Sequence, residues 1–166
     1  MRAADGTVVV IRSAVESDIA ALHRVDRMIF GRLAYPYFTL RQLIDVHNRH
    51  CVVADDGHGL LGYCLGALSI RPKTGWVLGL GVLPQSRNSG HGRDLISETV
   101  RRILADGARE VRLAVDPDNG AAIHVYETVG FRITGFQPHY FGPEADRLIM
   151  TTARPRASDA GDRHSA

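Results

Sequence analysis

The sequence has few of the features that would assign it to a specialised class of protein. Its 166 residues include only two cysteines, Cys51 and Cys64, too few for a disulfide framework. Both lie in apolar runs expected to form strands, so we expect buried thiols in a reducing compartment. No apolar run approaches the roughly 20 residues of a membrane span, and no apolar signal segment follows Met1. These absences favour a soluble, cytoplasmic protein without a membrane partner.

An excess of charge of one sign is also missing. The formal net charge is +2, and the basic residues are spread along the whole chain. Nucleic acids and anionic membranes bind concentrated basic faces, so the sequence predicts neither as a partner. His47 and His50 share a helix face and Cys51 follows them, but no second pair with zinc-type spacing exists. We therefore predict no metal site.

What is present is typical of a globular domain. Hydrophobic residues make up 45% of the chain and charged residues 23%. The length is enough for one domain with a core of its own. We expect a single domain over residues 1–153 and a disordered tail over residues 154–166, because the final PRASDAGDRHSA segment has no apolar run to bury.

Hydrophobic periodicity predicts an alternation of strands and helices. Strands are expected at residues 7–12, 51–54, 60–70, 76–83 and 110–115, from residue 130, and at 148–151. Helices are expected within residues 13–30, over 39–48, from about residue 93 to Gly107, and to about residue 129. Their expected N-terminal caps are Ser13 or Ser17, Thr39, and Asp118 or Asn119. The segment 55–59 predicts a hairpin turn. The order indicates a mixed α/β protein with helices packed on one sheet.

The junction QSRNSGHG, residues 85–92, lies between a predicted strand and a long predicted helix. A glycine-bearing turn that opens a helix directs free backbone N–H groups and the positive end of the helix dipole toward one point. Such a turn suits a pyrophosphate, and Gly90 and Gly92 allow the backbone to approach it closely. The same turn could also be an ordinary strand–helix connection. Neither G-x-G-x-x-G nor G-x-x-x-x-G-K-[ST] occurs in the chain.

Two motifs in register narrow the interpretation. The segment from Arg87 to Gly92 fits R/Q-x-x-G-x-G/A, and one helix and one strand later a second motif follows. This second motif, N-x-x-A-x-x-x-Y-x-x-x-G-F, is met by Asn119, Ala122, Tyr126, Gly130 and Phe131. Over roughly residues 7–152 the chain resembles the GNAT superfamily of N-acetyltransferases.

The resemblance implies a fold and a co-substrate. The GNAT fold has a central, mostly antiparallel sheet of six to seven strands, splayed between strands 4 and 5 and flanked by about four helices. Gly79 and Gly81 would weaken strand 4 and make the splaying plausible. The implied co-substrate is acetyl-CoA, with no metal.

The resemblance also assigns roles to residues of this chain. Backbone groups of Leu80 and Val82 would meet the pantetheine arm, together with Asn119. Tyr126 would protonate the departing thiolate. Arg87 opens the loop whose backbone N–H groups would cradle the pyrophosphate, namely those of Asn88, Ser89, Gly90, His91, Gly92 and Arg93.

The loop departs from the family pattern at three positions. Asn88 and Ser89 replace the usual arginine or glycine, and His91 replaces an aliphatic residue. Cradling by backbone groups tolerates these changes. We expect the His91 ring to be solvated in the first turn of the helix rather than to act as a base.

The late segment PHYFGPEADRLIM is similar to that of N-terminal protein acetyltransferases, including the ribosomal-protein type. The resemblance places Tyr140 and Phe141, and more loosely Tyr35 and Tyr37, in the wall of the acceptor pocket. Ala114 occupies the strand position where these enzymes often carry a glutamate or histidine base, so that base cannot be transferred to this chain.

The missing base bears on the choice of acceptor. An α-amine titrates near pH 8 and a lysine near about 10.4, so a site without a strong base suits an α-amine better. Water relays to Glu16, Asp116 or His139 are alternatives.

Two other functions stay open. One is acetylation of a small-molecule amine such as an amino acid, polyamine or aminoglycoside. The other is a non-catalytic acyl-CoA sensor, which Ala114 favours and Tyr126 opposes. The strand edges freed by splaying also allow a homodimer contact.

Overall fold

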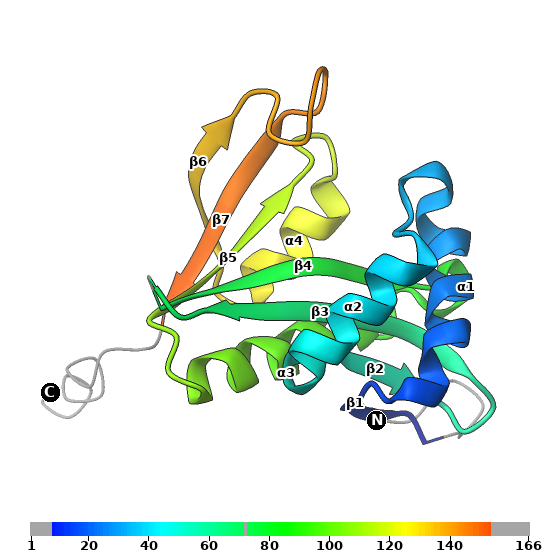
Figure 1. The fold of residues 1–166 in the computed structure, drawn as a ribbon. Coiled ribbons are helices and arrows are strands. Elements are labelled where there is room, and N and C mark those ends of the chain that lie inside the picture. Colours follow the sequence, from blue (N-terminus) through cyan, green and yellow to red (C-terminus); the bar gives the residue numbers. More distant parts are fainter. Residues whose placement is uncertain (1–7, 72, 154–166) are drawn as a thin grey trace, which may run out of the picture.

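Seven β-branched or apolar runs of the chain pair into one sheet in the computed structural model, which describes residues 8–71 and 73–153 (Figure 1). The strands are β1 (Val10–Ser13), β2 (Val52–Asp55), β3 (Leu60–Ser69), β4 (Thr74–Val82), β5 (Glu110–Val115), β6 (Arg132–Gln137) and β7 (Arg147–Ala153). Their order in the sheet is β1-β2-β3-β4-β5-β7-β6. All neighbours pair antiparallel except β4 and β5, which are parallel. The predicted mostly antiparallel sheet is therefore confirmed, while the expected tail lies outside the described residues.

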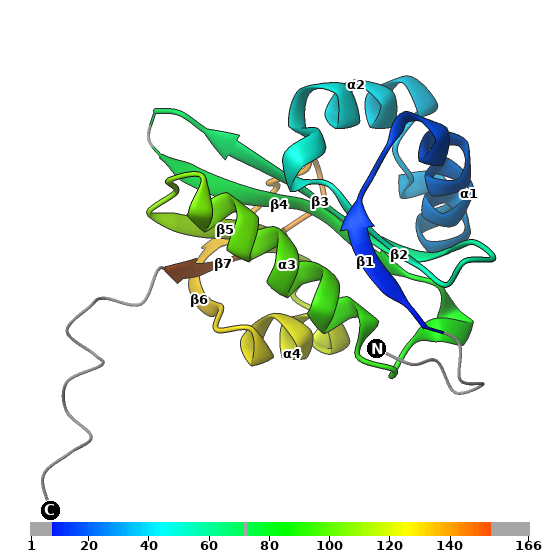
Figure 2. The same ribbon diagram turned by 90° about the horizontal axis from the view of Figure 1, so that it is seen from below.

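The helices form a layer on each face of the sheet (Figure 2). They are α1 (Ile19–Phe30), α2 (Tyr37–His47), α3 (His91–Ala105) and α4 (Gly120–Thr128), with short 3-10 turns η1 (Glu16–Asp18), η2 (Gly31–Leu33), η3 (Asn48–His50) and η4 (Pro84–Ser86). One core cluster joins α3 and α4 to the sheet, and a second lies beneath α1 and α2. The predicted apolar stripe of α3 is the largest helical contribution to the first core, with Leu95, Ile96 and Ile103 fully buried. Every helix among the described residues is too short or too polar to cross a bilayer.

The parallel pairing of β4 with β5 is short, and this shapes the site. It covers only Thr74–Val77 against Glu110–Leu113, after which the two strands separate (Figure 1). On its other side β4 carries a bulge, because Val77 pairs with Gly66 and Gly79 pairs with Leu65. Leu78 is thus an extra residue in the ladder, and a bulge of this kind bends a strand and ends its regular pairing. The predicted splaying between strands 4 and 5 is confirmed.

The predicted helix caps are correct only at α4. The Asn119 side chain accepts a hydrogen bond from the amide of Ala122 at 3.1 Å. Helix α1 has no side-chain cap, and the Ser13 hydroxyl instead accepts from Arg102 Nη1 at 2.7 Å. Helix α2 begins directly after Pro36, so Thr39 lies inside its first turn. Proline lacks an N–H and fixes its own φ, which suits the start of a helix.

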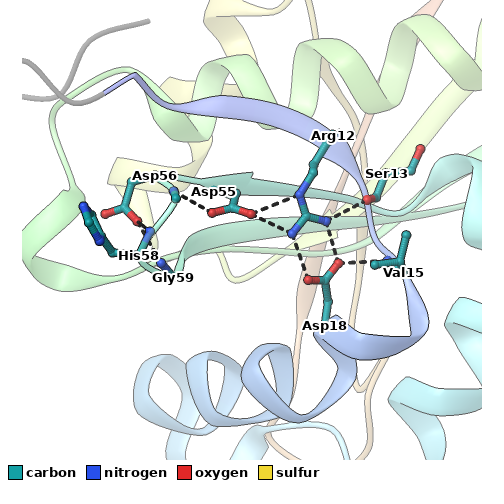
Figure 3. Close-up of polar contacts among 9 residues, drawn as sticks. Arg12, Ser13, Val15, Asp18, Asp55, Asp56, His58 and Gly59 are labelled. Carbon is teal, nitrogen blue, oxygen red and sulfur yellow. Dashed lines mark hydrogen bonds and ion pairs between the residues drawn. The ribbon is translucent and has the colours of Figure 1, made fainter.

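Arg12 of β1 joins three separate elements (Figure 3). Its Nη1 lies 2.6 Å from Asp18 Oδ2 in η1, and its Nη2 lies 2.7 Å from Asp55 Oδ2 at the end of β2. These hydrogen bonds from Arg12 hold the pKa of both carboxyl groups below the ordinary value. The adjoining hairpin turn is closed by Asp56, whose Oδ1 accepts from the amide of Gly59 at 2.8 Å. The edge strand β1 is therefore pinned to the start of α1 and to the predicted hairpin.

Candidate active site

The separation of β4 from β5 opens a cleft of about 430 Å³. Strand β4 contributes Leu80, Gly81 and Val82, and helix α1 contributes Ile29 and Phe30. The remaining walls come from the loop before α3 with its first turn, and from α4: Ser86, Arg87, Asn88, Gly90, His91, Gly92 and Arg93, then Asn119, Ala121, Ala122, His124, Val125 and Tyr126. The structure thus brings the predicted cofactor-binding residues together around one cleft, with the exception of Ser89. The Ser89 hydroxyl donates to the Arg87 carbonyl at 3.4 Å instead.

The start of α3 presents unpaired donors to this cleft. The first helical hydrogen bond runs from the amide of Asp94 to the carbonyl of Gly90 at 3.0 Å. The amides of His91, Gly92 and Arg93 therefore have no carbonyl of the helix to bond. Gly90 is the N-cap with φ +83, and Asn88 has φ +60, left-handed conformations that glycine and asparagine tolerate. Successive N–H groups at the positive end of a 15-residue helix make an anion site that fits a pyrophosphate.

His91 differs from the expectation of a solvated ring. Only 3% of its surface is exposed, and its Nδ1 has no hydrogen-bond partner among the described residues. The reason is helical periodicity, because His91 begins the face that continues with Leu95 and Thr99 toward the sheet. What His91 offers the cleft is therefore mainly its backbone amide.

Tyr126 is the predicted acid, and α4 holds it at the wall of the cleft. Its side chain is 8% exposed, and its ring packs against Phe131 with centroids 6.1 Å apart. Burial, and to a smaller extent the neighbouring Cys64 thiol, raises the pKa of the Tyr126 phenol. Like an ordinary tyrosine, Tyr126 is protonated at neutral pH, and burial makes it a weaker acid.

The edge of β4 that faces β5 has no strand partner beyond Val77. On the opposite side β4 stays paired with β3, for instance Leu80 with Cys64. An open strand edge of this kind can hydrogen-bond an extended, amide-containing chain as an additional strand would. The pantetheine arm, which contains two amides, meets that description.

The four aromatic residues predicted for the acceptor wall lie outside this cleft. Tyr35 lies in the connection from α1 to α2 and Tyr37 is the first residue of α2, whereas Tyr140 and Phe141 lie in the loop between β6 and β7. In Figure 1 these two segments stand on opposite sides of the divergence between β4 and β5.

Each of the four makes different contacts. The Tyr35 hydroxyl donates to the Leu78 carbonyl at 2.9 Å, whereas Tyr37 packs edge-on against His23. Tyr140 and Phe141 stack with centroids 4.9 Å apart, and Arg147 lies over the Phe141 ring. Tyr140 also lines a hollow on the sheet face that carries Trp76 and Arg112. Only Tyr35 is therefore bonded directly to the diverging strand.

The three side chains considered as bases acting through water, Glu16, Asp116 and His139, do not line the cleft. Glu16 pairs with Arg41 at 2.7 Å, and the Asp116 carboxylate accepts from the amide of Asp118 at 2.9 Å. His139 is exposed, and its amide donates to Asp146 at 2.8 Å. Ala114 pairs with Ile149 in the sheet. Within the described residues, the cleft thus has no carboxylate in its wall.

Sequence reasoning missed two groups of cleft residues. His124 and Val125 lie on α4 between Asn119 and Tyr126, so helical spacing could have indicated them. Ile29 and Phe30 come from α1, far away in the sequence, and no local signal places them here. His50, weighed as a metal ligand, binds Asp106 Oδ2 through Nε2 at 2.8 Å. The described residues contain no cluster of three or more His, Cys, Asp or Glu able to hold a metal.

Comparison with known proteins gives partial matches to two kinds of enzyme. The N-alpha-acetyltransferase RimI of Mycobacterium tuberculosis is 35% identical over 126 residues, covering 74% of this chain and 73% of that protein. A mycothiol acetyltransferase of Kocuria rhizophila is 42% identical over 60 residues, or 36% of this chain. The match covers only 20% of that enzyme's length.

Solved structures share the fold at low sequence identity. The ribosomal-protein-S18-alanine N-acetyltransferase from Escherichia coli superposes with a TM-score of 0.77 at 18% identity, covering 96% of this chain and 100% of that chain. Arabidopsis thaliana Naa50, in complex with the bisubstrate analogue CoA-Ac-MVNAL, gives a TM-score of 0.77 at 19% identity, over 88% of this chain and 99% of that chain. YncA from Salmonella typhimurium, solved with acetyl-CoA, gives 0.74 at 19% identity, over 90% and 99%.

The family model described as the acetyltransferase (GNAT) family matches residues 17–131, which include both motifs and most of the cleft. The chain therefore belongs to the GNAT family, a family of acyl-transferring enzymes.

Proposed function

We propose that this protein transfers the acetyl group of acetyl-CoA to the α-amine of a protein or peptide N-terminus. The observation that carries the proposal is one cleft that combines an open edge of β4, the free amides of the α3 N-terminus and the buried hydroxyl of Tyr126. Relatives named N-alpha-acetyltransferase support the choice of acceptor.

In this proposal the chain holds acetyl-CoA as a substrate through backbone groups. The amides of the loop from Asn88 to Arg93 receive the pyrophosphate, with Arg87 beside them. Leu80 and Val82 bind the pantetheine amides along the open edge of β4, and Asn119 contacts the same arm from the start of α4. Because these contacts use backbone atoms, the unusual side chains at positions 88, 89 and 91 do not prevent them.

Acetyl-CoA supplies an activated acyl group, and Tyr126 supplies the proton that the reaction needs. The acceptor nitrogen attacks the thioester carbonyl, so that a C–N bond forms and the C–S bond breaks. The Tyr126 hydroxyl protonates the departing thiolate and takes up a proton again from water, and the nitrogen, positively charged after its attack, loses a proton to water. The Tyr126 hydroxyl at the wall of the cleft is the donor that the motif assigns to this step.

A cleft wall without a carboxylate among the described residues, in which His91 is buried and His124 is exposed, suits an acceptor of low pKa. At pH 7.4 a sizeable share of an α-amine near pKa 8 is neutral, while a lysine near about 10.4 is almost wholly charged. Tyr35 and Tyr37 on one side and Tyr140 and Phe141 on the other would form the entrance for the acceptor. Naa50 carries a peptide in its bisubstrate complex, which is consistent with a peptide as acceptor.

A small-molecule amine is the second candidate acceptor. The match to mycothiol acetyltransferases, though short, is to enzymes named for a small molecule. The aromatic side chains of the two segments that flank the cleft, however, favour the larger peptide acceptor, because a small polar amine would not need them.

The first test is acetyl-CoA-dependent thiol release with N-terminal peptides, lysine peptides, polyamines and aminoglycosides. We expect turnover on the N-terminal peptides. Tyr126→Phe should lower kcat by about 100-fold or more while the Kd for acetyl-CoA changes little, because only the acid is removed. Preferred turnover on small amines would establish the second candidate. Acetyl-CoA binding without turnover on any amine would favour a sensor and contradict the proposal.

A further inference from the structure

The carboxyl group of Asp26 is buried beside the connection from α1 to α2, the segment that carries Tyr35. Asp26 of α1 is 1% exposed, and among the described residues it forms no ion pair. Its Oδ1 accepts a hydrogen bond from the hydroxyl of the equally buried Tyr63, and its Oδ2 accepts from the amide of Tyr35 at 2.6 Å. Burying a carboxylate costs free energy unless it accepts hydrogen bonds. The two hydrogen bonds from Tyr63 and Tyr35 therefore contribute to holding both residues in place.

Tyr35 extends this set of contacts to the diverging strand. Its hydroxyl donates to the carbonyl of Leu78 at 2.9 Å. Burial, and next the negative charge of Asp26, raises the pKa of Tyr35. Leu78 is the bulge residue and the first residue of β4 beyond its pairing with β5.

The rings of Tyr35 and Tyr63 lie side by side against β4 at Gly79. A Cβ on Gly79 would be 3.6 Å from Cε2 of Tyr35 and 3.7 Å from Cε2 of Tyr63. The Asp26 carboxylate, the two tyrosines and the bulge are thus continuous in space, from the middle of α1 to the point where the strands part.

We infer that Asp26 and Tyr35 are positioning residues that fix the acceptor entrance relative to the diverging strand. Asp26 holds the backbone of the segment that carries Tyr35 and Tyr37, and the Tyr35 hydroxyl ties that segment to the Leu78 carbonyl. The inference rests on the proposed function, because it assumes that the acceptor enters beside this segment. An entrance held in place before binding loses less entropy when the acceptor arrives, which lowers the acceptor KM.

The direct test is Tyr35→Phe, which keeps the ring and deletes only the hydroxyl. We expect the KM for the acceptor peptide to rise about 5- to 10-fold, the effect of one lost hydrogen bond. The Kd for acetyl-CoA should stay within about twofold, because neither Tyr35 nor Leu78 lines the cleft that would receive the cofactor. Asp26→Ala should raise the acceptor KM as well, since it removes the acceptor of the Tyr35 amide.

Tyr63→Phe is the matched control. It deletes the phenolic donor to Asp26 and leaves the contact between the Tyr35 hydroxyl and the Leu78 carbonyl intact. We expect it to lower the melting temperature with little change in the acceptor KM. If Tyr35→Phe behaves like Tyr63→Phe, with lower stability and unchanged KM, the contact is only structural and the inference is wrong.

Wild-type turnover separates this result from a failure of the proposed function. With turnover on N-terminal peptides and an unchanged acceptor KM in Tyr35→Phe, the inference falls and the proposed function stands. With no wild-type turnover on any peptide α-amine, the proposed function fails, and the inference fails with it.

Discussion

At the scale of single residues, charge pairing decides how the edge of the sheet is held. Arg12 donates to two carboxylates at once, and Asp18 is the better buried of them, with 10% of its side chain exposed against 24% for Asp55. Asp18 also accepts from the amide of Val15 at 2.9 Å, so it satisfies the first turn before α1 as well (Figure 3). An amide at position 18 would offer one acceptor oxygen in place of two and no charge, while the guanidinium would keep Asp55.

Asp18→Asn should therefore lower the free energy of unfolding by about 1–3 kcal/mol at pH 7. Arg12 lowers the pKa of Asp18 in the folded state, so the stabilisation is fully present above the ordinary carboxyl pKa near about 4. It is lost as the pH falls below that value and Asp18 takes up a proton. Urea unfolding of wild type and variant between pH 7 and pH 3 should show the two curves of stability against pH converging in acid.

Asp45→Asn is the control for that series. Asp45 pairs with Arg41 at 2.9 Å, but both side chains are largely exposed, so we expect little change in stability. A difference between wild type and Asp18→Asn that persists unchanged to pH 3 would contradict the role given to the Asp18 charge.

At the scale of elements, two glycines of β4 have different surroundings. A Cβ on Gly81 would lie 2.8 Å from Cδ1 of Ile29 and 3.1 Å from Cε1 of Tyr63. The Ile29 tip can turn away, but Tyr63 is fully buried and held by Asp26. The nearest atom to a Cβ on Gly79 is 3.6 Å away, an ordinary contact.

Gly81→Ala should therefore cost about 1–3 kcal/mol of stability through overpacking. It should also weaken acetyl-CoA binding, because Ile29 and Gly81 both line the cleft. Gly79→Ala is the matched variant, and it should be neutral or slightly stabilising because alanine loses less backbone entropy on folding. Thermal unfolding and the Kd for acetyl-CoA of both variants provide the measurement, and equal behaviour of the pair would argue against this packing.

At the scale of the whole molecule, the two halves of the sheet meet, among the described residues, through four residue pairs between β4 and β5. Beyond this contact the cleft has walls from β4 on one side and from α4 on the other. A ligand in the cleft contacts both halves and binds the folded state alone. Binding should therefore stabilise the whole domain.

CoA at about 100 times its Kd should add about 2.7 kcal/mol to the free energy of unfolding. For a chain of this length, that corresponds to a rise of about 5–10 °C in Tm. Thermal unfolding with increasing CoA tests this expectation, and a Tm independent of CoA would contradict the assignment of the cleft. Tyr35→Phe should show the same rise, because it leaves the cofactor side intact.

The prediction from sequence was correct for features that a short stretch of chain determines by itself. The alternation of strands and helices, the end of α3 before Gly107 and the Asn119 cap depend on residues within a turn or two. The two motifs indicated the family because their spacing along the chain reflects one loop and one helix that build the same cleft. The position of Tyr126 at the wall of that cleft followed from the same local register.

Tertiary structure alone decided the contacts between distant segments. Ile29 lines the cleft, and Asp26 accepts a hydrogen bond from Tyr63. Arg102 donates to the Ser13 hydroxyl, which was expected to cap α1. His91 is buried because its face of α3 lies on the sheet, which the polarity of the residue does not indicate. The physical reason is that periodicity records which side of an element is buried. It does not record which element covers that side, and strand register and helix packing determine this only when the whole sheet forms.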